Sequence, residues 1–110
     1  MNPAPELIAQ AEVVLHLNVE VSPENRERFL DFCRRAFPVY ESVGGAAMAL
    51  YEDLAAPGRF DEVGYYRTEE DYRRGEAAIK DDPVQAALIR EWRGLLESPP
   101  KVTVQRRRQP

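Results

Sequence analysis

Residues 52–72 read EDLAAPGRFDEVGYYRTEEDY, and this stretch decides the fold of the chain. It begins as the end of one strand, turns at Pro57-Gly58, continues as a second strand and reaches a helix start at Thr68. Proline and glycine favour tight turns, and Thr68 followed by Asp71 resembles a capping box with aspartate in place of glutamate. The stretch therefore predicts two antiparallel strands that lead directly into a helix.

The residues before this stretch predict one strand, one helix and the start of the hairpin. Side chains alternate between apolar and polar over residues 12–21, which is typical of a strand with one buried face. Residues 22–24 (Ser-Pro-Glu) predict a helix start, with a hydroxyl N-cap and proline in the first turn. Pro38 is expected to end or kink that helix. After Gly44-Gly45, residues 46–53 predict the second strand.

The residues after the stretch predict two consecutive helices and a last strand. Asp82-Pro83 is a second N-cap followed by a proline, so we expect separate helices over residues 68–80 and 83–96. Residues 101–106 alternate again. The order strand, helix, strand, strand, helix, strand predicts an α+β, ferredoxin-like βαββαβ fold with an antiparallel sheet. Right-handed crossovers then place the first and third strands in the centre of the sheet.

Helices should cover one face of this sheet and leave the other bare. We expect six residues under the helices: Leu15, Leu17, Val63, Tyr65, Val102 and Val104. The bare face would carry Val14, His16, Asn18, Glu20, Glu62, Gly64, Tyr66, Thr103 and Gln105. This semi-polar face suits either a solvated surface or a cavity closed by a second copy of the chain.

Composition limits the class of protein. The 110 residues form one domain, expected over 12–107 after a flexible extension at 1–11. The net charge of −4 argues against nucleic-acid and membrane partners. The N-terminus does not resemble a signal peptide, and the single cysteine fits a reduced compartment, so we expect a soluble cytoplasmic protein.

His16 is the best single candidate for chemistry, as a general acid or base, because its ordinary pKa lies near neutrality. Asn18 is the candidate hydrogen-bond donor to a substrate oxyanion. We expect these pocket-lining residues: Val14, Glu62, Tyr66, Thr103 and Gln105. The alternative is a structural histidine, bonded to a backbone carbonyl or placed in a dimer contact.

Other reactive residues favour structural roles. Cys33 lies on the apolar stripe of the first helix, which favours a packing thiol over a nucleophile. The buried stripe expected of the helix over residues 83–96 contains Trp92, as a core residue, together with Val84, Ala87, Leu88, Leu95 and Leu96. One histidine and one cysteine offer too few ligands for a transition-metal site, and we expect no metal and no cofactor.

The run Asp53, Pro57, Phe60, Tyr66, Thr68, Glu70 and Asp71 resembles the hairpin and helix start of antibiotic-biosynthesis-monooxygenase-like domains. The specific part of the resemblance covers residue 53 to about residue 83. It implies a dimeric α+β barrel, with the bare sheet faces of two subunits in contact. Some members of this family oxidise polycyclic aromatic compounds with O₂ and no cofactor, related members degrade haem, and many have no assigned activity.

The chain departs from the family pattern at three positions. Tyr66 stands where the family has a strand tryptophan, and Gly64 where a glutamate is common. The family's helix histidine is missing near residues 74–76. No catalytic role is carried over to these positions.

Three functions remain open from the sequence. The first is cofactor-independent oxidation or binding of a small aromatic compound, in a cavity between the sheet and a dimer partner. The second is a non-catalytic ligand-sensing or protein-interaction domain. The third is haem binding or degradation.

Overall fold

The computed structural model describes residues 4–110. The elements, in chain order, are α1 (Ala4–Gln10), β1 (Val13–Glu20), α2 (Arg26–Glu41), β2 (Ala46–Glu52), β3 (Arg59–Tyr66), α3 (Glu69–Asp81), α4 (Pro83–Leu95) and β4 (Lys101–Arg106). The predicted α+β order is confirmed, including the break between α3 and α4. The additional element is α1.

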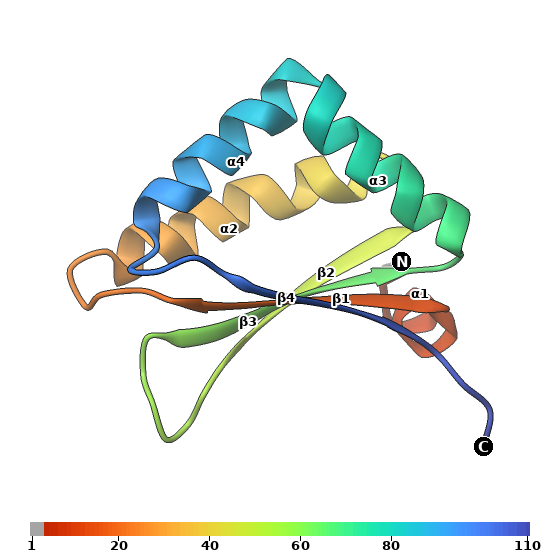
Figure 1. Cartoon of the computed structure of the whole chain (residues 1–110), viewed down its shortest axis with the longest axis horizontal. Helices are drawn as coiled ribbons and strands as arrows, with labels where there is room; N and C mark the ends of the chain where they lie inside the picture. The colour runs from red at the N-terminus through yellow and green to blue at the C-terminus, as the bar shows by residue number, and fades with distance from the viewer. Residues whose placement is uncertain (1–3) are drawn as a thin grey trace.

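The four strands form one antiparallel sheet in the order β2-β3-β1-β4, so β1 and β3 are central as predicted. The helices α2, α3 and α4 lie together on one side of this sheet (Figure 1). In the register, Leu17 of β1 stands opposite Glu62 of β3 and Val102 of β4. Directly opposed residues point to the same face, so this register sets the face of every other side chain.

The register corrects the predicted faces of β3. Glu62 and Tyr66 face the helices together with Leu15 and Leu17, because paired residues share a face. Val63 and Tyr65, predicted to lie beneath the helices, face the other side. The residues that we call the open face are Val14, His16, Asn18, Ala47, Ala49, Tyr51, Asp61, Val63, Tyr65, Thr103 and Gln105.

The first long helix differs from the prediction at both ends. It starts at Arg26, one turn after Ser22, whose hydroxyl accepts a hydrogen bond from the N–H of Asn25 at 3.3 Å. The helix also continues through Pro38 to Glu41. Proline removes one hydrogen bond of the helix, and here it does so only in the last turn, where the helix is close to its end.

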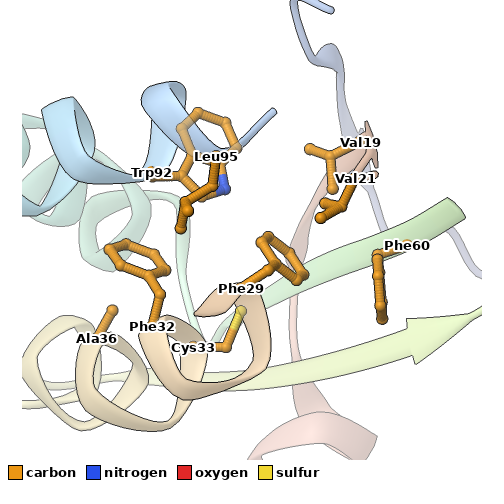
Figure 2. Close-up of a cluster of buried hydrophobic side chains, with 9 residues drawn as sticks. All are labelled: Val19, Val21, Phe29, Phe32, Cys33, Ala36, Phe60, Trp92 and Leu95. Carbon is orange, nitrogen blue, oxygen red and sulfur yellow. The ribbon is translucent and has the colours of Figure 1, made fainter. Parts of the chain in front are cut away.

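The core lies between the sheet and helices α2 and α4 (Figure 2). Phe29 and Phe32 of α2 have no exposed surface. The ring of Phe29 packs against Phe60 of β3, with the centroids 4.8 Å apart. Trp92 and Leu95 close the cluster from α4. Each such side chain contributes about 1.5–3 kcal/mol through burial, so this cluster fixes α2 and α4 to the sheet.

The N-terminal helix α1 lies on the opposite side of the sheet from the other helices (Figure 1). It contacts β2 and β3, and its Leu7 is buried. This cover explains why Val63 and Ala47 of the open face are buried. We expected a flexible extension over residues 1–11; its described part contains a packed helix, and its mobility stays a prediction.

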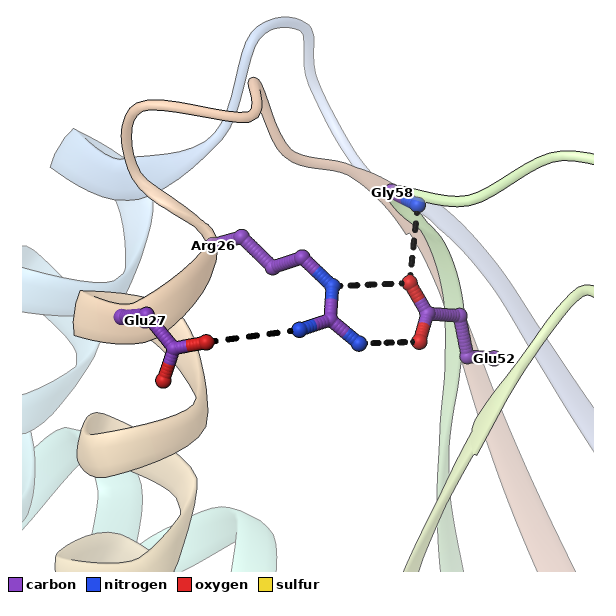
Figure 3. A network of polar contacts seen from close by, with 4 residues as sticks. All are labelled: Arg26, Glu27, Glu52 and Gly58. Atoms are coloured by element: carbon purple, nitrogen blue, oxygen red, sulfur yellow. Dashed lines mark hydrogen bonds and ion pairs between the residues drawn. The ribbon is translucent and has the colours of Figure 1, made fainter.

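An ion pair joins the start of α2 to the hairpin (Figure 3). The guanidinium of Arg26 donates two hydrogen bonds to Glu52, at 2.6 and 3.1 Å. Glu52 also accepts the backbone N–H of Gly58 at 2.9 Å. The hydrogen bonds from Arg26 and from Gly58 lower the pKa of Glu52. The carboxylate therefore holds the turn that follows β2 against the helix start.

A helix residue also contacts the outer edge of β2. The carboxylate of Glu41, at the end of α2, accepts the backbone N–H of Met48 at 2.9 Å. Since β2 pairs only with β3 in this sheet, that N–H has no strand partner. Glu41 therefore satisfies a backbone donor that the sheet leaves unpaired.

Within residues 4–110, the structure contains no helix that is long and apolar enough to cross a membrane.

Replacing Gly58 with alanine is expected to lower the free energy of unfolding by about 1–3 kcal/mol. Gly58 has φ +93°, and an added Cβ would lie 2.6 Å from the backbone oxygen of Val21. Thermal or urea unfolding of Gly58→Ala measures the loss. Gly94→Ala is the matched control, since its added Cβ would meet nothing within 4 Å. Equal stabilities of the two variants would contradict the prediction.

Candidate functional site

A small cavity of about 50 Å³ lies between the sheet and the three long helices. Most of its wall is apolar, with a few polar groups, which is the usual character of a small-molecule site. The lining residues are Leu15, Leu17, Tyr40, Met48, Glu62, Tyr66, Gly75, Ile79, Gln85, Ile89 and Trp92.

Glu62 is the charged group of the cavity wall. It projects from β3 under the helices and is only 3 % exposed. The indole N–H of Trp92 donates a hydrogen bond to Oε2 of Glu62 at 2.6 Å. The thiol of Cys33 lies 3.7 Å from Oε1 and donates a weaker hydrogen bond. One group from α2 and one from α4 therefore orient the carboxyl of Glu62.

Burial raises the pKa of Glu62 to about 7. The hydrogen bonds from Trp92 and Cys33 oppose this shift, and the nearby charge of Asp61 adds to it. A carboxyl with this pKa exchanges its proton near neutral pH, as a general acid or base must. The same environment raises the pKa of Cys33 and of Tyr40, chiefly through burial, so both remain protonated.

Gln85 of α4 brings a neutral polar group to the cavity. It is the third residue after the N-cap Asp82, where a glutamine often reaches back to the N-cap N–H. In this chain the oxygen of Ala78 accepts that N–H instead. As a residue Gln85 is 2 % exposed, and its amide forms no hydrogen bond with another residue among residues 4–110.

Tyr66 and α3 form another wall. The ring of Tyr66 lies between two glycines, and a Cβ added at Gly64 or Gly75 would lie 3.0 or 3.2 Å from it. Burial raises the pKa of Tyr66 to about 12, so its hydroxyl stays neutral. None of the residues of α3, all of them described, is buried. Of the helices over the cavity, α3 is therefore the one most easily displaced.

The cavity is small for an aromatic ligand. A cavity of about 150 Å³ is known to hold benzene, whereas about 50 Å³ holds one or two water molecules. An aromatic ring needs the wall to move outward. Gly75 and Ile79, the lining residues from α3, belong to the helix that is held least firmly.

The predicted residues of the bare face are divided between two faces. His16, Asn18, Val14, Thr103 and Gln105 do lie together on the open face. Nδ1 of His16 lies 3.0 Å from a carboxylate oxygen of Asp61, a partner that the sequence did not suggest. Asn18 lines a broad hollow of about 490 Å³ near the hairpin. Val14 and Gln105 line another, of about 510 Å³, beside α1.

Glu62 and Tyr66 do not join this group. They point under the helices, so they cannot line a pocket with His16 and Asn18 on the opposite side of the sheet. The prediction of a single pocket that contains all seven residues is therefore wrong. The error lies in β3, whose two faces were assigned the wrong way round.

The sequence reasoning missed Gln85 and Tyr40 as cavity residues and placed Trp92 only in the core. It assigned Val84 to the buried stripe of α4, but Val84 is 59 % exposed and Gln85 is buried in its place. The signal was the spacing of Gln85, Ile89 and Trp92, which puts a polar residue on an apolar helix face.

Within residues 4–110, no group of three or more histidine, cysteine, aspartate or glutamate residues could hold a metal ion.

Comparisons with known proteins identify the fold. No protein-family model matches the sequence, and no curated protein matches it. Solved structures do match. A conserved protein from Methanosarcina mazei is 13% identical, with a TM-score of 0.78, over 94% of this chain and 99% of that one. An antibiotic biosynthesis monooxygenase is 12% identical, with a TM-score of 0.72, over 88% and 99%.

A third similar structure is a variant of SnoaB, a cofactor-independent oxygenase from Streptomyces nogalater. It is 16% identical, with a TM-score of 0.74, over 91% of this chain and 96% of that one. The matches span nearly the whole length of both partners, and sequence identity this low establishes the fold alone. The chain has the fold of an antibiotic-biosynthesis-monooxygenase-like domain.

Proposed function

We propose that this protein binds a small phenolic compound in the cavity beneath its helices and oxidises it with O₂, with Glu62 accepting the phenolic proton. The observation that carries the proposal is the buried Glu62 carboxyl, oriented by Trp92 at the wall of the cavity. The fold shared with a cofactor-independent oxygenase supports the reaction class. Glu62 replaces His16 as the leading acid–base candidate.

The proposed chemistry needs no group beyond the substrate, O₂ and the side chains. Glu62 takes the hydroxyl proton, and the phenolate gives an electron to O₂. The resulting radicals combine at a ring carbon, and Glu62 returns the proton to the peroxide. The O–O bond and the ring C–H bond then break, water leaves, and a quinone carbonyl remains. One oxygen atom of O₂ ends in the quinone and the other in water.

The cavity supports this sequence in two ways. Its apolar wall excludes bulk water, which strengthens the effect of each polar group on the developing phenolate. Its restricted size requires α3 to move outward before a ring enters. Such a movement is compatible with an enzyme that closes over its substrate.

Oxygen consumption with a panel of single-ring phenols and hydroquinones tests the proposal. Glu62→Gln keeps the shape of the side chain and removes the base, so we expect turnover to fall by about 100-fold or more. His16→Ala is the control, because His16 lies across the sheet from the cavity, and it should retain turnover. Loss of turnover only in His16→Ala would refute the role of Glu62 and return the site to the open face.

Glu62 should also make stability depend on pH. Its pKa in the folded protein, about 7, exceeds the ordinary value of 4.5, so the folded state binds more protons between these values. The free energy of unfolding should therefore fall by about 3 kcal/mol as the pH rises from below 4.5 to above 7.

Urea unfolding across that range, compared between the wild type and Glu62→Gln, measures this contribution. The variant should lose the slope that Glu62 supplies, while Asp61, Cys33 and Tyr40 remain the same in both proteins. In the wild type the fluorescence of Trp92, the single tryptophan, should change with an apparent pKa of about 7. Identical pH profiles for the two proteins would contradict the assignment.

The non-catalytic alternative has its own support. A cavity with an apolar wall and a few oriented polar groups can bind a ligand without turning it over. Ligand binding with no oxygen consumption would favour it. The haem alternative has less support, because the sole histidine of the chain lies on the open face, away from this cavity.

We also propose that two subunits associate through the open face, as the family resemblance implies. Support comes from the half-buried side chains there and from Tyr51, a large aromatic side chain that is 52 % exposed. In such a dimer His16 and Asp61 would lie in the contact between subunits. A cavity there would require the second subunit to complete it.

Thr103→Glu should break this dimer, because it places a charge on the open face. Val102→Glu is the matched control: the neighbouring side chain points to the other face and is already 57 % exposed. Light scattering at micromolar concentration should give a dimer for the wild type and for Val102→Glu, and a monomer for Thr103→Glu. A monomeric wild type would overturn the proposal.

A further inference from the structure

Among the described lining residues, Gln85 supplies the one side-chain amide of the cavity. It is 2 % exposed, lines the cavity and has no hydrogen-bond partner within residues 4–110. Buried polar groups are normally hydrogen-bonded, either to other residues or to ordered water. Leucine at this position would continue the apolar stripe with Ile89 and Trp92. The amide of Gln85 is not one of the fully buried polar groups without a partner, so it opens onto the cavity, where water or a ligand must bind it.

The charges around the cavity limit what that ligand can be. Among the described lining residues there is no lysine, arginine or histidine, and the one ionisable carboxyl is Glu62. A buried anion would therefore find no counter-charge and would be repelled by Glu62. The polar groups of the cavity wall are the amide of Gln85, which donates and accepts, the carboxyl of Glu62, which accepts when ionised, and the neutral hydroxyls of Tyr40 and Tyr66. None of them supplies a positive charge.

We propose that Gln85 is a specificity-determining residue that contacts the ligand, and that the ligand is an uncharged, single-ring compound with a hydroxyl group. The amide N–H of Gln85 donates to the hydroxyl oxygen, and the hydroxyl hydrogen faces Glu62. This inference rests on the proposed function, because it concerns the same cavity and the same proton.

The arrangement gives Gln85 a role that grows as the reaction begins. When the hydroxyl proton passes to Glu62, negative charge develops on the ligand oxygen. A hydrogen bond from a neutral donor to an anion is stronger than one to a hydroxyl group, so the amide stabilises the phenolate more than the phenol. Gln85 thus selects a hydroxyl-bearing ligand and favours its ionised form.

The size limit follows from which walls can move. α3 contributes Gly75 and Ile79 and has no buried residue along its described length, so it can yield enough room for one ring. The wall formed by α4 cannot move outward in the same way. Trp92 is hydrogen-bonded to Glu62 and belongs to the core cluster with Phe29 and Phe32. A fused polycyclic compound would have to disrupt that core.

Binding of phenol, toluene and benzoate tests the inference. The three probes share one ring and differ in having a hydroxyl group, no polar group or a negative charge. Their affinities are measured by the fluorescence of Trp92 and checked by chemical-shift changes. We expect the wild type to bind phenol more tightly than toluene and benzoate least.

Gln85→Met replaces the amide with an apolar side chain of similar length. It should weaken phenol binding about tenfold and leave toluene binding equal or tighter, because one hydrogen bond is lost. Gln85→Leu serves as a second variant if Gln85→Met folds poorly. Val84→Ala, on the adjacent exposed position of α4, is the control and should keep the wild-type preference.

An unchanged ratio of phenol to toluene affinity in both Gln85 variants would overturn the inference. Benzoate binding as tight as that of phenol, or no binding of any probe at millimolar concentration, would also overturn it. Failure of the proposed oxidation gives a different result: wild-type protein that prefers phenol through Gln85 but consumes no oxygen. Conversely, oxygen consumption that depends on Glu62 with no effect of Gln85 refutes only the present inference.

Discussion

The antiparallel register between β1 and β3 is the constraint on which the rest of the structure depends. It sets Leu17 opposite Glu62 and thereby turns a glutamate toward the helices. A shift of one residue would expose that carboxyl and bury its neighbour Val63 beneath the helices instead. Because the carboxyl is buried, it needs donors, and Trp92 and Cys33 supply them from two different helices. The sheet register, the helix packing and the proton affinity of the site are therefore linked.

The helices that cover the sheet differ in how firmly they are held. α2 and α4 bury aromatic side chains in a common core, whereas α3 rests on the sheet without a buried residue along its described length. α3 is held by its N-cap at Thr68, by the ring of Tyr72 against Tyr66, and by polar contacts near the surface from Arg106 to Glu69 and from Arg74 to the backbone oxygen of Gly44. The site thus combines a rigid half, which orients Glu62, with a more mobile half, which controls its volume. A chemical role for Glu62 requires both.

The strand order could be predicted because turns, caps and alternation agreed along the whole chain. The faces of β3 could not, because Phe60, Val63, Tyr65 and Tyr66 place large apolar side chains on both sides of that strand. In such a segment the alternation of apolar and polar residues does not tell which side chains point to the helices. The pairing of β3 with β1 decides this. A similar ambiguity affected α4. Val84 was predicted to be buried, but it is exposed, and the polar residue next to it, Gln85, is buried. The candidate site depended on both assignments, so it was less predictable than the fold.

The hydrogen bond from the Met48 N–H to the carboxylate of Glu41 has a consequence for the behaviour of the protein at high concentration. Edge strands with free backbone donors can recruit strands from other molecules and start aggregation. On β2 a side chain from the protein's own helix occupies such a donor. On β4, the opposite edge, Lys101 and Arg106 place positive charges at the two ends of the strand. These features protect the margins of the sheet from growth into fibres, while its face remains free for association with defined geometry.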